Sequence, residues 1–269
     1  MKTFILTGAT GGIGKEILKK LLENNFFVIA TDIDKNLLLK LKKENSNYSD
    51  YFITEFLDVR NESNWKKIIK KANEQKYPFY GLIHSAGVLL PAYIQNSSSK
   101  DLDFHIDINV KGSILGSQLA SKILIQKKEG HIFHIASLAG ISPVPGIALY
   151  SCSKFAIRGF SLALSIELEK YNVKVTAICP DAVTTPMLDL QKDYEEAALT
   201  FSGSSALSPS LIADIIFKNI GKNIFEINIP LSRSIQAKFA GLFPQLASKL
   251  LSIYKNKGLE NQKKYSKSI

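Results

Sequence analysis

Cysteine, histidine and long apolar runs are all scarce in this chain of 269 residues. Its two cysteines, Cys152 and Cys179, are too few for a disulfide framework, and their spacing is not that of a metal site. No grouping of the four histidines with Asp or Glu along the sequence suggests a metal site. We therefore predict no bound metal, and a reducing compartment, the cytoplasm.

No apolar run reaches the roughly 20 residues that a membrane-spanning helix needs. The apolar N-terminus is interrupted at Gly8–Gly14, too early for a signal peptide. A hydrophobic share of 45% with 22% charged residues is typical of a folded globular protein rather than a disordered one. The length suits one large α/β domain.

The net charge of +10 is unevenly distributed. Residues 230–269 contain one acid, Glu260, and eight bases, so this segment carries 8 − 1 = +7 of the +10. The bases are Arg233, Lys238, Lys249, Lys255, Lys257, Lys263, Lys264 and Lys267. The arginine-rich grooves and stacking aromatics typical of nucleic-acid binding are absent, so we expect no nucleic-acid partner.

Short apolar segments alternate with helical patterns along the chain. The patterns predict helices at 15–24, 61–73, 101–126, 150–171 and 209–222, and strands at 2–7, 26–32, 52–57, 80–85, 131–136, 173–179 and 223–229. This alternation predicts an α/β fold with a single Rossmann-like, doubly wound parallel sheet of about seven strands and helices on both faces. Residues 1–229 would form this domain, with an inserted lid at about 187–209.

The C-terminal extension, residues 230–269, is basic and amphipathic. Its apolar positions 235, 239, 242 and 243, and after Pro244 positions 246, 250, 253 and 254, have helical spacing. We expect two short helices here. They would either pack on the domain or a second subunit, which is the commoner use of such stripes, or hold the protein peripherally at a membrane near a lipid substrate.

The segment Gly8-Ala-Thr-Gly11-Gly12-Ile-Gly14 lies between a predicted strand and a predicted helix. Such a turn lets the backbone approach a pyrophosphate, and the N-terminus of the helix supplies free N–H groups. The next strand ends at Asp32, where a carboxylate would bind ribose hydroxyls. Together these features predict a dinucleotide site.

Tyr150 and Lys154 are four residues apart, so on a helix they share one face. A lysine close to a phenol favours the phenolate and lowers a pKa that is ordinarily near 10. The hydroxyl of Ser137 could hold a substrate oxygen beside them. This set predicts proton transfer for an alcohol/ketone pair.

In order and spacing these motifs resemble the short-chain dehydrogenase/reductase family over roughly residues 1–229. The resemblance rests on Thr7-Gly8-x-x-x-Gly12-x-Gly14, Asp58-Val59, Ser85-Ala86-Gly87, Asn109, Ser137, Tyr150-x-x-x-Lys154 and Pro180-x-x-Val183-x-Thr185. It implies a catalytic set of Asn109, Ser137, Tyr150 and Lys154. It also implies cofactor contacts from Gly8, Thr10, Gly12, Ile13, Gly14, Asp32, Asp58, Val59, Ala86, Gly87, Tyr150, Lys154, Pro180, Val183 and Thr185.

The resemblance also implies the role of each catalytic residue. Tyr150 would be the general acid/base, and Lys154 would lower its pKa and bind the nicotinamide ribose. Ser137 would polarise the substrate oxygen, and Asn109 would distort its helix and hold a water in a proton relay. Pairing through the two central helices, as in some family members, would give a homodimer or homotetramer.

The sequence favours NAD(H) over NADP(H). Asp32 would repel the 2′-phosphate of NADP, and Ile33 and Asp34 follow it, so no arginine is at hand to bind that phosphate.

Two positions depart from the family pattern. His84-Ser85-Ala86-Gly87 replaces Asn-Asn-Ala-Gly, and we interpret His84 as structural. Asp181 replaces a glycine after Pro180, and we hypothesise that its carboxylate stabilises the oxidised nicotinamide.

The predicted function is oxidoreduction of a hydrophobic secondary alcohol or ketone, because the lid and the segments 88–93 and 138–149 are mostly apolar. A small polyol and a carrier-bound 3-oxoacyl group stay open. One alternative is a membrane-associated NAD(H)-binding sensor without turnover. Another is a nucleotide-sugar epimerase or dehydratase, whose glycine pattern Gly8, Gly11 and Gly14 also fit, although such enzymes need a larger C-terminal domain.

Overall fold

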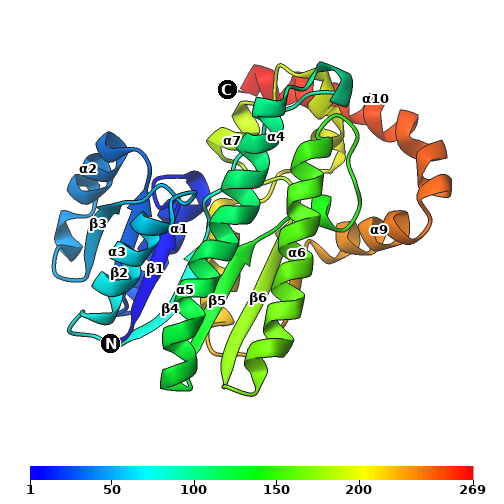
Figure 1. Cartoon of the computed structure of the whole chain (residues 1–269). Coiled ribbons are helices and arrows are strands. Elements are labelled where there is room, and N and C mark those ends of the chain that lie inside the picture. Colours follow the sequence, from blue (N-terminus) through cyan, green and yellow to red (C-terminus); the bar gives the residue numbers. More distant parts are fainter. Residues whose placement is uncertain (269) are drawn as a thin grey trace.

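The computed structural model describes residues 1–268 (Figure 1). Within them, parallel strands form a seven-stranded sheet in the order β3-β2-β1-β4-β5-β6-β7. The strands are β1 (Thr3–Thr7), β2 (Phe27–Asp32), β3 (Phe52–Phe56), β4 (Phe79–His84), β5 (Gly130–Ile135), β6 (Val173–Pro180) and β7 (Glu226–Ile229). The predicted doubly wound sheet is confirmed. The strand order reverses between β1 and β4, the place where such sheets bind ligands.

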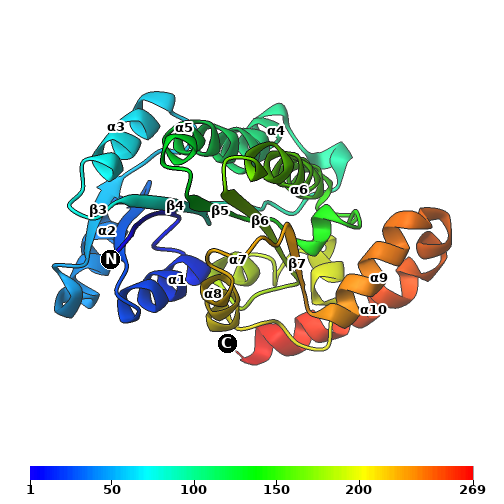
Figure 2. The same ribbon diagram turned by 90° about the horizontal axis from the view of Figure 1, so that it is seen from below.

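Helices cover both faces of the sheet (Figure 2). One face carries α3 (Glu62–Asn73), α4 (Ser99–His105), α5 (Gly112–Lys127) and α6 (Ala148–Glu169). The other carries α1 (Gly12–Glu23), α2 (Lys35–Glu44) and α8 (Pro209–Lys218). Short helices are η1 (Ser46–Tyr48), η2 (Ile94–Asn96), η3 (Ile106–Lys111), η4 (Leu138–Gly140), α7 (Pro186–Asp189) and η5 (Glu195–Ser202).

The sequence pattern did not reveal α2. Its leucines lie on more than one face: Leu38 and Leu41 are buried, but Leu37 and Leu39 are exposed, so the helical period is blurred. The helix begins at a strong local signal instead. The side chain of Asp34 accepts hydrogen bonds from the main-chain N–H groups of the first turn, as an N-cap does.

Alternating side chains of the central strands build two core layers. On β1, Phe4 and Leu6 pack in the layer beneath α1 and α8, whereas Ile5 packs in the layer with Trp65 of α3. All three β1 residues are fully buried. A sheet covered on both faces explains why these strands read as continuous apolar runs. The rigid sheet fixes where each strand end, and so each site residue, lies.

The C-terminal extension forms two helices, α9 (Leu231–Leu242) and α10 (Pro244–Ser268), which make a hairpin at one end of the molecule (Figure 1). The two predicted helices are present, but α10 is a long helix of 25 residues. Two glycines allow close packing. A Cβ on Gly241 would lie 2.6 Å from the carbonyl oxygen of Ile141, and one on Gly258 would lie 2.0 Å from that of Ala198. None of the described helices combines the length and apolar composition needed to cross a bilayer.

Candidate active site

The glycine-rich turn lies between β1 and α1, beside the start of the loop after β4. Gly8 has a φ of +62°, and a Cβ there would lie 2.8 Å from the main chain of Ala86. A Cβ on Gly14 would lie 2.0 Å from the carbonyl oxygen of Gly8. Both positions therefore require glycine. Because α1 begins at Gly12, its first N–H groups point towards the turn, which is a favourable place for a pyrophosphate.

Asp32 connects the end of β2 to the glycine-rich turn. Its Oδ2 accepts hydrogen bonds from the main-chain N–H (3.1 Å) and the hydroxyl (2.7 Å) of Thr10, and its Oδ1 accepts one from Ile33 N (2.8 Å). Lys35, the nearest base in sequence, places its ammonium 5.0 Å from the centre of the Phe56 ring. The carboxylate thus lies at the end of β2, held against the glycine-rich turn by Thr10.

The loop after β3 is fixed in a similar way. The guanidinium of Arg60 pairs with both carboxylate oxygens of Asp58 and lowers the pKa of that carboxyl. Val59 accepts a hydrogen bond from the indole of Trp65 and packs against Gly112, where a Cβ would lie 2.7 Å from Val59 Cγ2. The loop therefore packs against the first residue of α5.

Thr7 holds the segment that follows β4. Its hydroxyl oxygen accepts from the main-chain N–H groups of Ser85 and Ala86, each at 3.1 Å. His84, the first departure from the family pattern, stacks on Trp65, and burial holds its pKa well below the ordinary value. A neutral, buried ring agrees with a structural role for His84.

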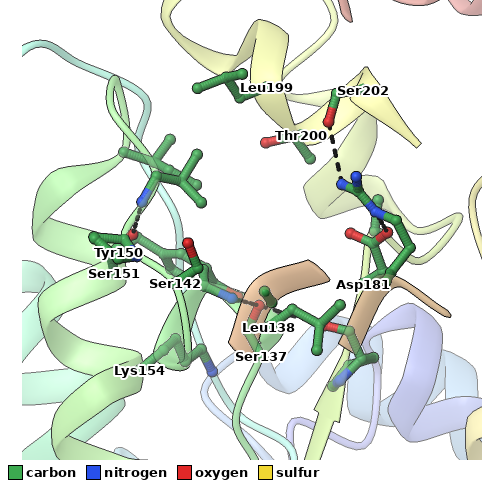
Figure 3. A pocket seen from close by; sticks show the side chains of 18 of the residues that line it. Ser137, Leu138, Ser142, Tyr150, Ser151, Lys154, Asp181, Leu199, Thr200 and Ser202 are labelled. Carbon is green, nitrogen blue, oxygen red and sulfur yellow. Dashed lines mark hydrogen bonds and ion pairs between the residues drawn. The ribbon is translucent and has the colours of Figure 1, made fainter. Parts of the chain in front are cut away.

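The structure brings together the three residues predicted to transfer a proton. Ser137 follows β5, and Tyr150 and Lys154 project from α6 towards it (Figure 3). Both α6 side chains are buried. Nζ of Lys154 lies 5.3 Å from the centre of the Tyr150 ring and donates a hydrogen bond to the carbonyl of Ile135 at 2.8 Å.

The pKa values correct one expectation. Burial raises the pKa of Tyr150 to about 12, although a hydrogen bond with Ser137 opposes this shift. Burial also lowers the pKa of Lys154 to about 8. The prediction that Lys154 lowers the pKa of the phenol is therefore wrong for this structure. The physical reason is that the ammonium is directed at a main-chain carbonyl, while loss of water penalises both charged forms.

Asn109 lies in a π-helical turn, η3, that interrupts the helix predicted at 101–126. The local distortion that the resemblance implies is therefore present. Its amide is fully engaged with the main chain of Val88 (2.8 and 2.9 Å) and the hydroxyl of Ser153 (2.9 Å). A Cβ on Gly87 would lie 3.3 Å from Asn109 Oδ1 and 3.5 Å from Lys154 Nζ, so these polar ends meet beside Gly87.

The segment after β6 closes the other side of the site. The Ser137 hydroxyl lies 3.5 Å from the carbonyl oxygen of Pro180. Thr185 approaches the glycine-rich turn, because a Cβ on Gly12 would lie 2.6 Å from its Cγ2. Val183 forms a bridge with Leu207 at the end of the predicted lid. Ile13, Gly87, Pro180, Val183 and Thr185 line the same cavity as the catalytic residues.

That cavity has a volume of about 1060 Å³ and runs from Ser137, Tyr150 and Lys154 to the lid and the hairpin of α9 and α10. In Figure 3, Ser137 and Tyr150 lie on one side, with Thr200 and Ser202 on the opposite side. Among residues 1–268, no three His, Cys, Asp or Glu side chains come together as metal ligands.

The sequence matches the short chain dehydrogenase family over residues 2–196. This span is most of the chain and includes the glycine-rich turn and the Ser-Tyr-Lys set. The protein belongs to the short-chain dehydrogenase family. The expected family membership is thus confirmed.

Relatives of the dehydrogenase include enzymes with different substrates. It is 32% identical over 219 residues to an NADP-dependent 3-hydroxy acid dehydrogenase of Salmonella typhi, covering 79% of this chain and 86% of that one. It is 30% identical to the diacetyl reductase ((S)-acetoin forming) of Staphylococcus epidermidis, over 70% of this chain and 74% of the reductase. The closed form of a serine dehydrogenase complexed with NADP⁺ superposes with a TM-score of 0.76 and 27% identity, over 84% of this chain and 94% of that one. The protein is therefore an oxidoreductase of the nicotinamide-dependent kind.

The dehydrogenase contains an ion pair in its cavity wall that the sequence did not reveal. Arg233 of α9 donates to Asp181 at 2.8 Å and to the hydroxyl of Ser202 in the lid at 3.1 Å. Asp181 therefore faces a guanidinium, which opposes the hypothesis that its carboxylate stabilises a positive nicotinamide. No local pattern could reveal this pairing, because Arg233 is 52 residues from Asp181.

The C-terminal half of α10 holds the predicted lid of the dehydrogenase. The amide of Gln262 donates to the carbonyls of Gln191 and Tyr194, each at 2.8 Å. Asn261 donates to the carbonyl of Phe201 at 2.9 Å, and Lys255 pairs with Glu195 at 2.6 Å. The Ser-Gly-Ser-Ser composition at 202–205 suggests free movement, but these contacts tie the segment to α10.

Proposed function

We propose that the protein interconverts a hydrophobic secondary alcohol and its ketone, with NAD(H) as the cofactor. The observation that carries this proposal is the cavity beside Tyr150, which has hydroxyl and ammonium groups at one end and apolar side chains along most of its remaining wall. A hydroxyl or carbonyl of the substrate fits beside Ser137 and Tyr150, and an apolar remainder fits the rest.

The arrangement supports a role for each catalytic residue. When bound, the nicotinamide would supply or accept the hydride at the substrate carbon. The Ser137 hydroxyl would orient the substrate oxygen, and Tyr150 would donate a proton to it in reduction. Because the pKa of Tyr150 is raised to about 12, the phenol is protonated at neutral pH and ready for reduction. Oxidation needs the phenolate, so its rate should rise with pH.

The residues of the glycine-rich turn, Asp32, Asp58, Val59, Ala86 and Gly87, and the segment Pro180–Thr185, would hold the dinucleotide. We favour NAD(H) because the charge of Asp32 would meet the 2′-phosphate of NADP at the end of β2. Residues 187–209 would act as the substrate lid and Asn109 as part of a proton relay.

The test of this function is the appearance or loss of NADH absorbance with a panel of alcohols and ketones, from small polyols to apolar compounds. Turnover confined to apolar members supports the proposal. Turnover only with small polyols, or only with sugar nucleotides, contradicts it. Cofactor binding without any turnover, unaffected by Tyr150→Phe, would instead indicate the sensor.

We also propose a cytoplasmic location with a peripheral membrane contact, which apolar residues on the outside of the hairpin support. Leu242 and Ile253 are 75% and 64% exposed and do not line the cavity, and Lys249 lies between them in sequence. Such a surface fits anionic lipid. Sedimentation with anionic vesicles should retain the protein, and Ile253→Glu should release it. Ile166→Glu, at an equally exposed site on α6, is the control.

The homodimer or homotetramer stays a prediction. Sedimentation velocity over a range of protein concentrations tests it.

A further inference from the structure

The cavity continues well past the catalytic residues. Its far wall is made by α9 and α10, which contribute Ile235, Phe239, Ala240, Leu246, Ala247 and Leu250. Its volume of about 1060 Å³ is at the upper limit of the range of about 300–1,000 Å³ that is usual for small-molecule sites. The end near Tyr150 also contains the nicotinamide position, but that group alone would leave the far part empty.

The far wall is apolar yet incompletely covered. Phe239 and Leu250 line the cavity, but 53% and 48% of their surfaces are exposed. Helices that turn apolar residues to water normally bury them against another apolar surface. The charged groups in the adjoining wall satisfy one another, because Arg233 is bonded to Asp181 and Ser202. The wall therefore favours an uncharged, apolar ligand.

A second copy of the chain suits this wall poorly. Between Glu226 and Glu260 the sequence has no acid but five bases, among them Lys238 and Lys249. Two such hairpins facing each other would bring like charges together. A flexible apolar ligand that enters from the catalytic end meets no such repulsion, and the cavity connects it directly to Tyr150.

We propose that the substrate carries an extended aliphatic tail, and that this tail lies between α9 and α10 while its oxygen-bearing carbon is at Tyr150. The inference rests on the proposed function for the reacting end, and it adds the substrate class and the residues that measure tail length. Ala240 on α9 and Ala247 on α10 are specificity-determining positions, because each is a small residue in this part of the wall.

The first test is chain length. For methyl ketones of four to about fourteen carbons, KM should fall about two- to fourfold with each added methylene until the hairpin is filled, as expected for burying a CH₂. The rate constant kcat should change little, since the reacting end is the same. A KM that does not depend on chain length overturns the proposal.

The second test places the tail. In Ala247→Trp and Ala240→Trp the indole would fill the space between the helices, so the fall in KM should stop at a shorter chain, while the shortest ketones react as in the wild type. Ser252→Trp is the matched control, because Ser252 is exposed on α10 and does not line the cavity. If both cavity variants keep the wild-type dependence on chain length, the tail does not lie there.

A binding readout separates this inference from the proposed reaction. Cys152 lines the cavity and is exposed, whereas Cys179 is buried, so a thiol reagent should label Cys152. Ketones should slow this labelling, increasingly with chain length, and Ala247→Trp should reduce that dependence. Protection without turnover would leave the tail site standing and remove the reaction. Labelling that no ketone slows would remove the tail site even if turnover occurs.

Discussion

The sheet with its glycine-rich turn and the hairpin of α9 and α10 use apolar residues in opposite ways. On β1, every residue from Thr3 to Thr7 is buried, and the family match of residues 2–196 contains this region. On the hairpin, which lies outside that match, Phe239 and Leu250 line the cavity and yet are about half exposed. The buried residues of β1 stabilise the fold, whereas the apolar residues of the hairpin still need another apolar group to cover them. In the proposed function, this difference would separate the part that binds the cofactor from the part that selects the substrate.

Removing the hydroxyl of Tyr150 should produce the largest effect, and it should lower the rate of the reaction without changing the hairpin. Tyr150→Phe is expected to lower kcat by about 10²–10⁴, because general acid/base catalysis contributes that much. NADH binding, followed by fluorescence, should change less than about twofold. Tyr171→Phe, at the end of α6, is the control and should keep full activity. Unchanged turnover in Tyr150→Phe would show that another group transfers the proton.

A change at Asp32 should alter the choice of cofactor without affecting the substrate. In Asp32→Ser the repulsion of the 2′-phosphate is lost, so KM for NADPH should fall about tenfold or more relative to KM for NADH. The KM for a given ketone should stay the same. If the wild-type protein already prefers NADPH, the proposed role of Asp32 is refuted, whatever the variant does.

Substitutions at two helical glycines compare the stability of the hairpin with that of a helix that covers the sheet. Gly258→Ala in α10 would place a Cβ 2.0 Å from the carbonyl of Ala198, so we expect a loss of about 1–3 kcal/mol or release of the lid from α10. Gly159→Ala in α6 meets nothing within 4 Å, so helix propensity should stabilise the protein by about 0.5–1 kcal/mol.

Urea unfolding measures both variants, and proteolysis within residues 187–209 reports release of the lid. Equal free energies of unfolding and equal proteolysis in Gly258→Ala and the wild type would show that α10 does not hold the lid.

The smallest expected effect is the contribution of Lys154 to the pH dependence of the free energy of unfolding. The pKa of Lys154 is about 8 in the folded protein and ordinarily 10.5, so between these values the unfolded chain binds the extra proton. Stability should therefore rise with pH through this window because of Lys154. Lys154→Met removes the rise. Urea unfolding near pH 7 and near pH 9.5 should show the wild type gaining stability relative to the variant; parallel changes would contradict the burial argument.

Local sequence patterns were sufficient to predict much of the sheet and of the residues at its end of the cavity. The sequence alone determined the alternation of strands and helices, the glycine-rich turn and the Tyr150–Lys154 pair, because each depends on near neighbours or on a period of two or 3.6 residues. It also predicted two helices at residues 230–269 from their apolar spacing.

Only the tertiary structure decided how distant segments meet. The contact of Arg233 with Asp181 and the packing of Gly258 on Ala198 join residues more than fifty positions apart. The raised pKa of Tyr150 depends on burial by several elements at once, which no local pattern encodes. The extension of the cavity into the hairpin belongs to the same class, because a cavity is the space that side chains from separate helices leave between them.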